Sequence, residues 1–585
     1  MSRFCVMTPD GPDQRTRRTS SRRAALASTF VATCLALALL APASSAQLGG
    51  YSTPVDLGGV GGALIAVDPQ GRATVLGAKN WRIRAVRLNA AGKPGPVRML
   101  SRKGAEARAV QVAVDPQGRA TVVWRRVDRP NGSIEAVRIS AAGKPGPVRR
   151  LTAPPNQNHW APQVAVDPQG RATVVWLKDG QRVQAVRLDA AGNPGPTQTL
   201  YQAVHHYSGV APQVAVDPDG RATVVWRGAT FDALNRVATS SIQAVRLDAS
   251  GEPGLVRTLA EADGNLIRPP RIAVDRDGRT TVVWRRADGP SHLDPAGSVE
   301  AVRLDAAGEP GAIRTLSEPG DGVVAPRVAV DPDGGATVVW RRETRDPALG
   351  RVAASTVQAV RLDSGGDPGP VRTLSPPRQP RPGTAAYVAL DPEGRATVVW
   401  QRADRRGSRV QAVRLDAAGD PGVVQTLTVS RDRNTFGGPL VAVDSAGRAT
   451  VVWVRRETFR RPDGLFTRTR VQAAHSVRLF AVRAQPRRRT VGPGTTQVHY
   501  RFRATNMDTE PSGVVRLCAK APSRRVKVLG KRCRVFEDIE PGAGVRRVVR
   551  VRPLGRARGK LTRIRLRARG PNVEAGTTVR LKVRR

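Results

Sequence analysis

The side chains best suited to chemistry lie in two short segments, Asn156–Trp160 (NQNHW) and Tyr201–Tyr207 (YQAVHHY). Together they carry amides, imidazoles and aromatic rings, groups that stack on sugars and hydrogen-bond to them. We therefore take six of their residues as candidate ligand-binding residues: His159, Trp160, Tyr201, His205, His206 and Tyr207. A metal or general-base role needs a suitably spaced carboxylate, and neither segment supplies one. The alternative is that all six are solvated loop residues without a ligand.

A second candidate set is the carboxylates of a recurring Asp-Pro-x-Gly turn. In this turn the Asp side chain bonds the backbone two residues on, Pro presets φ, and Gly accepts a positive φ. The turns at Asp217, Asp275 and Asp331 carry two carboxylates each, which suggests a calcium loop as an alternative. With the aspartate as position one, none of these turns has the Glu that a calcium loop requires at position twelve. We therefore predict hairpin turns, and no metal or other cofactor.

These turns belong to a repeat. Its aspartates are 47 to 60 residues apart, a spacing typical of four-stranded propeller blades, and stand at Asp68, Asp115, Asp167, Asp217, Asp275, Asp331, Asp391 and Asp444. Each unit has four β-rich runs, such as VAV, ATVVW, QAVRL and PVRTL. Nine residues after the aspartate, seven units carry a tryptophan: Trp124, Trp176, Trp226, Trp284, Trp340, Trp400 and Trp453. Repetition at one position predicts packing between blades. The first unit has Gly77 instead.

The last unit lacks its PVRTL run, and Pro54–Leu57 near the beginning of the chain matches that run. Pairing of this segment with the eighth unit would close the ring and protect its sheet edges. The sequence thus predicts an all-β protein with an eight-bladed β-propeller over residues 47–474, a seven-bladed ring being the alternative.

Two motifs of the repeat resemble a known family. The D-x-x-G-R hairpin (Asp115, Gly118, Arg119) and the R-L-D-x-x-G turn (Arg187–Asp189, Gly192) are similar to those of bacterial delta-sixty-repeat propellers. The resemblance covers about residues 50–474, although P-G-P-V-R-T-L replaces that family's closing L-D-x-x-F. It implies an exported propeller and no particular chemistry.

From residue 475 to residue 585, alternating apolar and basic runs predict a β-sandwich. Cys518 and Cys533 are the only cysteines left once a signal peptide is removed, so we predict one disulfide. The runs GVVRLCAKAP, GKRC and EPGAGVRRVVRVRP resemble immunoglobulin-like domains of the CARDB-like group, which implies an accessory domain without catalysis. Arg563, Arg565, Arg567 and Arg569 should line one exposed face.

Residues 1–46 have the layout of a secretory signal peptide: Arg15–Arg23 is basic, Ala24–Leu40 is apolar, and small residues end at Ala46. A retained membrane anchor is the alternative, and Ser21–Leu26 loosely resembles a twin-arginine export motif. We expect a secreted or extracytoplasmic monomer with no membrane-spanning segment once the signal is removed.

The chain carries 95 Lys+Arg against 48 Asp+Glu, a formal net charge of +47, of which residues 475–585 hold +24. Such charge attracts anionic polymers. Arginine outnumbers lysine 85 to 10, so the codon bias of a GC-rich genome is an alternative explanation.

Loop lengths vary most between the second and third runs of each unit, which indicates a candidate binding face on that side. We predict an exported, non-enzymatic binding or scaffold protein that contacts an anionic envelope polymer or a surface protein. Export disfavours a specific nucleic-acid partner. A propeller hydrolase or lyase acting on polysaccharide is the alternative function.

Overall fold

A computed structural model describes the chain from residue 51 to residue 584, apart from short internal segments. The positions left out are 53, 58–62, 103, 105, 129–130, 153–157, 204–210, 235, 265, 290–295, 319–321, 346–351, 377–384, 405–406, 429–434, 462–463, 477–479, 487, 507–513, 523, 538, 540–542, 558 and 571–572. The predicted signal peptide lies outside the described residues, as do His205, His206 and Tyr207. Within the described residues, no helix could cross a membrane.

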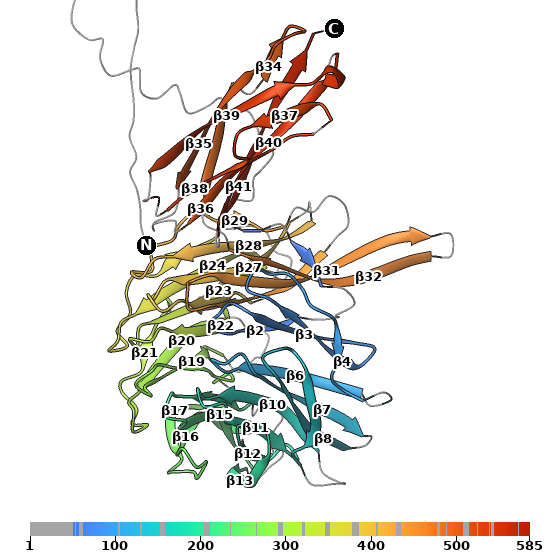
Figure 1. Cartoon of the computed structure of the whole chain (residues 1–585). Coiled ribbons are helices and arrows are strands. Elements are labelled where there is room, and N and C mark those ends of the chain that lie inside the picture. Colours follow the sequence, from blue (N-terminus) through green and yellow to red (C-terminus); the bar gives the residue numbers. More distant parts are fainter. Residues whose placement is uncertain are drawn as a thin grey trace, which may run out of the picture. The chain divides into compact units, whose positions relative to one another are not determined.

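In the described part of residues 51–476, the chain forms eight four-stranded antiparallel sheets, numbered here from sheet one to sheet eight in chain order (Figure 1). In sheets one to seven, four consecutive strands pair with their sequence neighbours. These strands are β2 (Leu64–Val67), β3 (Ala73–Lys79), β4 (Arg82–Leu88) and β5 (Arg98–Met99); β6 (Glu106–Val114), β7 (Ala120–Asp128), β8 (Asn131–Ile139) and β9 (Pro145–Arg150); β10 (His159–Val166), β11 (Ala172–Lys178), β12 (Arg182–Leu188) and β13 (Pro194–Gln202); β14 (Gln213–Val216), β15 (Ala222–Phe231), β16 (Val237–Leu247) and β17 (Arg257–Asp263); β18 (Arg271–Val274), β19 (Thr280–Ala287), β20 (Gly297–Leu304) and β21 (Arg314–Thr315); β22 (Gly322–Val330), β23 (Ala336–Arg345), β24 (Val352–Leu362) and β25 (Arg372–Thr373); β26 (Tyr387–Leu390), β27 (Ala396–Asp404), β28 (Gly407–Leu415) and β29 (Gln425–Thr426). The all-β prediction is confirmed.

Sheet eight takes its fourth strand from the beginning of the described chain. Its strands are β30 (Thr435–Val443), β31 (Ala449–Arg461), β32 (Gly464–His475) and β1 (Val55–Asp56), and β1 pairs with β32. The Leu57 amide donates to the Val471 carbonyl at 2.9 Å, and the Leu57 side chain is buried in the cluster that joins sheets one and eight. The clasp predicted at Pro54–Leu57 is therefore present, and β32 has no open edge at this point.

The repeated aspartate closes the turn from the first to the second strand of each sheet. In sheet one, the Gly71 amide donates to the Asp68 carbonyl at 2.8 Å, and Gly71 has a φ of 77°, which glycine adopts without strain. The buried Asp68 carboxylate accepts hydrogen bonds from the Arg72 amide (2.8 Å), Arg72 Nε (2.7 Å) and Arg87 Nη2 (2.8 Å). Arginines also hold Asp217 and Asp275 in two of the turns that carry two carboxylates. These carboxylates act as structural centres of their turns.

The tryptophans of the repeat are buried and pack on the preceding sheet. Trp226 of sheet four lies in one hydrophobic cluster with Val175 and Leu177 of sheet three, and its indole N–H donates to Gln243 Oε1 at 2.8 Å. The other six buried tryptophans are Trp124, Trp176, Trp284, Trp340, Trp400 and Trp453. Gly77 takes this position in sheet one, so the cluster between sheets eight and one has no tryptophan among its described residues.

The described residues from 480 onward form two further sheets that share one hydrophobic cluster, to which Phe502 and Leu566 contribute from opposite sheets. The four-stranded sheet has the order β33 (Phe480–Gln485), β35 (Val498–Asn506), β39 (Gly544–Pro553) and β37 (Val526–Leu529). The five-stranded sheet has the order β34 (Arg488–Val491), β41 (Val573–Val583), β40 (Leu561–Gly570), β36 (Val515–Lys520) and β38 (Cys533–Phe536); a short 3-10 helix, η1 (Gly555–Ala557), follows β39. Cys518 and Cys533 form a disulfide between β36 and β38, which confirms that prediction.

Candidate anion-binding groove

The candidate residues of the first segment lie in a strand rather than in a loop. His159 begins β10 and is only 2 % exposed; its Nδ1 lies 2.9 Å from the Gly132 carbonyl oxygen, and its ring contacts Trp176 edge-on. Trp160 is half-buried and packs against the cluster of sheets three and four, with the Arg125 guanidinium 5.8 Å from its ring centroid. These are contacts of packing side chains, and a ligand-binding role for either residue stays a prediction.

Tyr201, from the second segment, also lies in a strand. It is near the end of β13, with its ring 5.5 Å from the ring of Trp226, and burial raises the pKa of its phenol. His205, His206 and Tyr207 lie outside the described residues, so no geometry tests the sugar-binding prediction for them.

The segments of variable length between the second and third strands were expected to be loops, but parts of them continue as paired strands. β31 and β32 stay paired from Trp453–Gln472 out to Arg461–Gly464, and Figure 1 shows this hairpin as the longest in its sheet. Antiparallel strands can continue to pair beyond the packed core because each added residue pair satisfies its own backbone groups.

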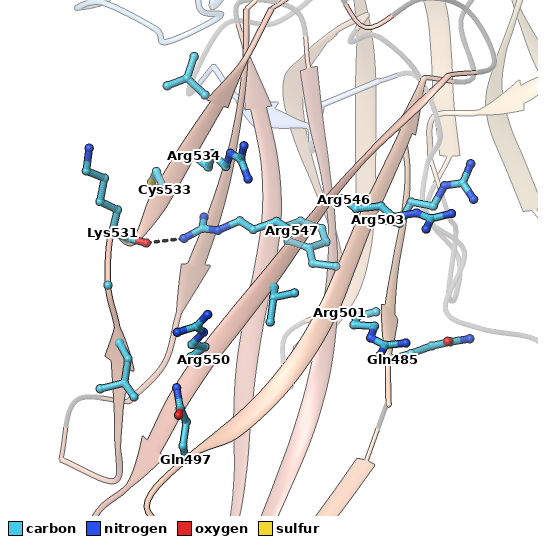
Figure 2. A pocket seen from close by; sticks show the side chains of 16 residues that line it. Gln485, Gln497, Arg501, Arg503, Lys531, Cys533, Arg534, Arg546, Arg547 and Arg550 are labelled. Carbon is cyan, nitrogen blue, oxygen red and sulfur yellow. Dashed lines mark hydrogen bonds between the residues drawn. The ribbon is translucent and has the colours of Figure 1, made fainter.

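A wide concave site lies on the C-terminal sheets, not on the repeat. This basic groove has a volume of about 1530 Å³ (Figure 2). Seven of its lining side chains are cationic: Arg501, Arg503, Lys531, Arg534, Arg546, Arg547 and Arg550. Among the described residues that line it, none is a carboxylate.

The alternation of β35 and β39 places these cations. Along β35, Phe502 and Ala504 are buried in the core, which turns Arg501 and Arg503 to the open face. On β39 the same alternation exposes Arg546 and Arg550. Arg503 stands directly opposite Arg546 in the register, and Figure 2 shows the two side by side. Like charges directly opposite each other destabilise a sheet, so this face carries an electrostatic cost.

Arg547 connects the groove to the five-stranded sheet. Its guanidinium donates to the backbone carbonyls of Leu517, Lys531 and Arg532, the last at 3.0 Å; the bond to Lys531 is drawn in Figure 2. Burial, followed by the charge of Arg534, lowers the pKa of Arg547. Arg547 therefore positions the segment before β38, while the exposed arginines face solvent.

The groove cations differ from the arginines of the repeat in their partners. Arg72 and Arg87 both contact the Asp68 carboxylate within 3 Å. Among side chains that the structure describes from residue 480 onward, no arginine or lysine lies within 4 Å of a carboxylate oxygen. The groove can therefore neutralise its charge with an anionic ligand.

The exposed basic face predicted from the sequence lies on the five-stranded sheet, not on the sheet that forms the groove. Arg563 and Arg565 of β40 are indeed exposed there, and Arg567 is half-buried. The groove on β35 and β39 was missed, although the runs HYRFRA and RRVVRVR carry the same alternation. What those runs do not reveal is the segment before β38, which folds beside them and makes the surface concave.

No family model matches the chain, and no curated protein matches it. It is similar to the solved structure of a lectin, BP39L from Burkholderia pseudomallei, with 12 % identity, a TM-score of 0.42 and coverage of 65 % of this chain and 99 % of the lectin. It is also similar to the WD40 domain of SCAP from fission yeast, with 10 % identity, a TM-score of 0.41 and coverage of 73 % of this chain and 98 % of that domain. A third similar structure is that of a prolyl endopeptidase, with 12 % identity and a TM-score of 0.40. The match covers 76 % of this chain but only 57 % of the length of the endopeptidase.

The eight four-stranded sheets and the clasp strand β1 support the prediction of a β-propeller, whereas the solved structures have TM-scores below 0.5 and carry no argument. They include a lectin and a peptidase and so assign no function. The delta-sixty-repeat and CARDB-like resemblances stay predictions. Among the described residues, no group of three His, Cys, Asp or Glu side chains is placed to hold a metal ion.

Proposed function

We propose that the protein is a non-catalytic binding protein that holds an anionic polysaccharide of the cell envelope in the basic groove. The observation that carries this proposal is the set of seven cationic side chains that line one groove, with no carboxylate among its described lining residues. Guanidinium groups match carboxylate, sulfate and phosphate groups in geometry as well as in charge. An extended polymer would contact several of them at once and release their counterions.

The number of blades and the type of the C-terminal domain are also part of what we propose. The eight sheets are taken as eight blades of a ring closed by β1, and the two C-terminal sheets as an immunoglobulin-like sandwich. The repeats, the clasp and the shared C-terminal cluster support this assignment. Removal of residues 1–46 on export would place the chain at the cell surface or in the periplasm, where such polymers occur; amino-terminal sequencing of the secreted chain, expected to begin at Gln47, tests this step.

The test compares two polymers of the same backbone, dextran sulfate and neutral dextran, by binding to the chain that begins at Gln47. The groove variant carries Arg501→Gln, Arg503→Gln, Arg546→Gln and Arg550→Gln. The matched control removes the same charge from exposed positions of the five-stranded sheet: Arg516→Gln, Arg563→Gln, Arg565→Gln and Arg580→Gln. We expect binding of dextran sulfate alone, weakened at least tenfold in the groove variant and under threefold in the control. Equal losses in the two variants would reject the groove as the site.

A further inference from the structure

The inner strands of the propeller hold a second, separate group of unpaired cations. The residue four positions before the repeated aspartate lies at the start of the paired core of each inner strand and is half-buried in all eight sheets. It is glutamine in sheets two to four (Gln111, Gln163 and Gln213), arginine in sheets five and six (Arg271 and Arg327), tyrosine in sheet seven (Tyr387) and leucine in the other two. The fold therefore accepts uncharged residues here.

The side chains at this position share one orientation in three neighbouring sheets. Gln213 Nε2 donates to the Pro212 carbonyl at 2.8 Å, Arg271 Nη1 to the Pro270 carbonyl at 3.3 Å, and Arg327 Nη1 to the Pro326 carbonyl at 2.9 Å. Because each group bonds the carbonyl of its own preceding proline, the three lie at the same end of their strands.

The two arginines stand at equivalent positions of β18 and β22, strands that contact each other. The Arg327 guanidinium lies 5.1 Å from the ring centroid of Tyr387 on the next inner strand. Neither arginine forms an ion pair with a carboxylate among the side chains that the structure describes. Burial, followed by the charge of Arg327, lowers the pKa of Arg271 to about 10. Two like charges that are partly removed from water without a partner destabilise the free protein.

A β-bulge adds to the placement of Arg327. The register of β22 with β23 shifts between Val324 and Arg327, and Ala325 has a φ of 52°. Bulges of this kind re-aim the side chains that follow them. The same shift occurs in sheets two, three and eight, where Ala109, Ala161 and Gly438 have a positive φ, so the bulge is a feature of the repeat and not of Arg327 alone.

We propose that Arg271 and Arg327, flanked by Gln213 and Tyr387, bind the oxyanion group of an acidic sugar at the inner strands of the propeller. Two guanidinium groups supply charge and paired donors for one carboxylate, sulfate or phosphate. The amide and the phenol add hydrogen-bonding groups suited to sugar hydroxyls. This site is separate from the basic groove and does not depend on it.

The test uses four ligands with the same ring: glucose, glucuronate, glucose 6-sulfate and glucose 6-phosphate. Binding is measured by calorimetry at low salt in the groove-variant background, so that the groove contributes little. We expect no binding of glucose and binding of at least one acidic sugar, and the preferred one identifies the anion. Arg271→Gln and Arg327→Gln should each weaken that binding at least tenfold, since glutamine is the residue that three other sheets carry here.

The matched control is Arg276→Gln, which removes one charge from the turn at the other end of β18, where Arg276 pairs with Asp333 at 2.9 Å. It should change the affinity less than twofold. The proposal is overturned if no acidic sugar binds, if glucose binds equally well, or if the control loses as much affinity as Arg271→Gln. If the wild-type chain does not bind dextran sulfate, only the groove is rejected as a site, because the test with acidic sugars does not depend on the groove.

Discussion

The repeated aspartate is the residue that most directly ties the sequence to the fold. Asp167 is fully buried, and its carboxylate contacts Arg171 Nε at 2.7 Å and Arg187 Nη2 at 2.8 Å. Asp167→Asn leaves two guanidinium groups around a neutral amide, so we expect a loss of about 3 kcal/mol in the free energy of unfolding. Urea unfolding followed by tryptophan fluorescence measures it.

Asp219→Asn is the control for this change, because Asp219 lies on the next turn, is exposed and pairs with Arg221 at 3.1 Å. It should cost less than about 0.5 kcal/mol. If Asp167→Asn costs as little as the control, the buried turn carboxylate is not structural, and the calcium alternative would then need a direct test.

Glu300 gives a pH-dependent prediction at the same scale. Burial raises its pKa, and its Oε2 accepts the Trp284 indole N–H at 2.7 Å. The folded state therefore disfavours the ionised carboxyl, and stability falls as the pH rises from the ordinary value of 4.5 through the folded pKa. Glu300→Gln, which copies Gln243 of sheet four, should stabilise the chain at pH 7 by up to about 1 kcal/mol and have little effect below pH 4. Melting temperatures across this range check it; a stabilisation that persists at pH 3 would contradict it.

At the scale of the elements, the clasp strand β1 makes a specific prediction. Removal of residues 47–57 exposes the edge of β32 and uncovers the apolar side chains packed around Leu57. Exposed edges pair with other chains, so the shortened chain should form oligomers or aggregates while the chain that begins at Gln47 stays monomeric. Light scattering coupled to size exclusion distinguishes them. Asp56→Asn, which alters the partly exposed pair with Arg470 and keeps β1 in place, should stay monomeric.

The disulfide belongs to the element scale as well. Cys518 and Cys533 are 15 residues apart, and the acceptors of Arg547 at Leu517, Lys531 and Arg532 adjoin them. Replacement of both cysteines by serine should destabilise the C-terminal sheets by about 3 kcal/mol and weaken dextran sulfate binding, because the wall of the groove before β38 loses its anchor. A reducing agent should have the same effects on the wild-type chain and none on the serine variant. Unchanged binding after reduction would contradict this link.

Elements set by local chemistry were predictable from the sequence, and features set by distant contacts were not. The Asp68 turn, the Trp226 position and the clasp at Leu57 follow from turn residues and repetition. The burial of His159 depends on the Gly132 carbonyl of another sheet, which no local pattern reveals. The groove depends on Lys531 and Arg534, which fold beside β39, and the arginine pair depends on the contact of sheet five with sheet six.

For the whole molecule, the distribution of the positive charge tells more about function than the net charge does. The repeat pairs many of its arginines with its own aspartates, as around Asp68 and Asp275. The C-terminal region holds +24 of the formal +47 with few acids to balance it. Codon bias explains a general excess of arginine but not the gathering of seven cations in one concave site without a carboxylate among its described residues. The charge of the groove is therefore the part that we connect with function.

The most direct measurement is the affinity for dextran sulfate as a function of salt, for the chain from Gln47, the groove variant and its matched control. If the groove holds the polymer, log K against log salt should be less steep in the groove variant, by roughly one for each arginine that contacts the polymer, and nearly unchanged in the control. Parallel lines for all three proteins, or equal reductions in the two variants, would contradict the account, because binding would then follow net charge and not the groove.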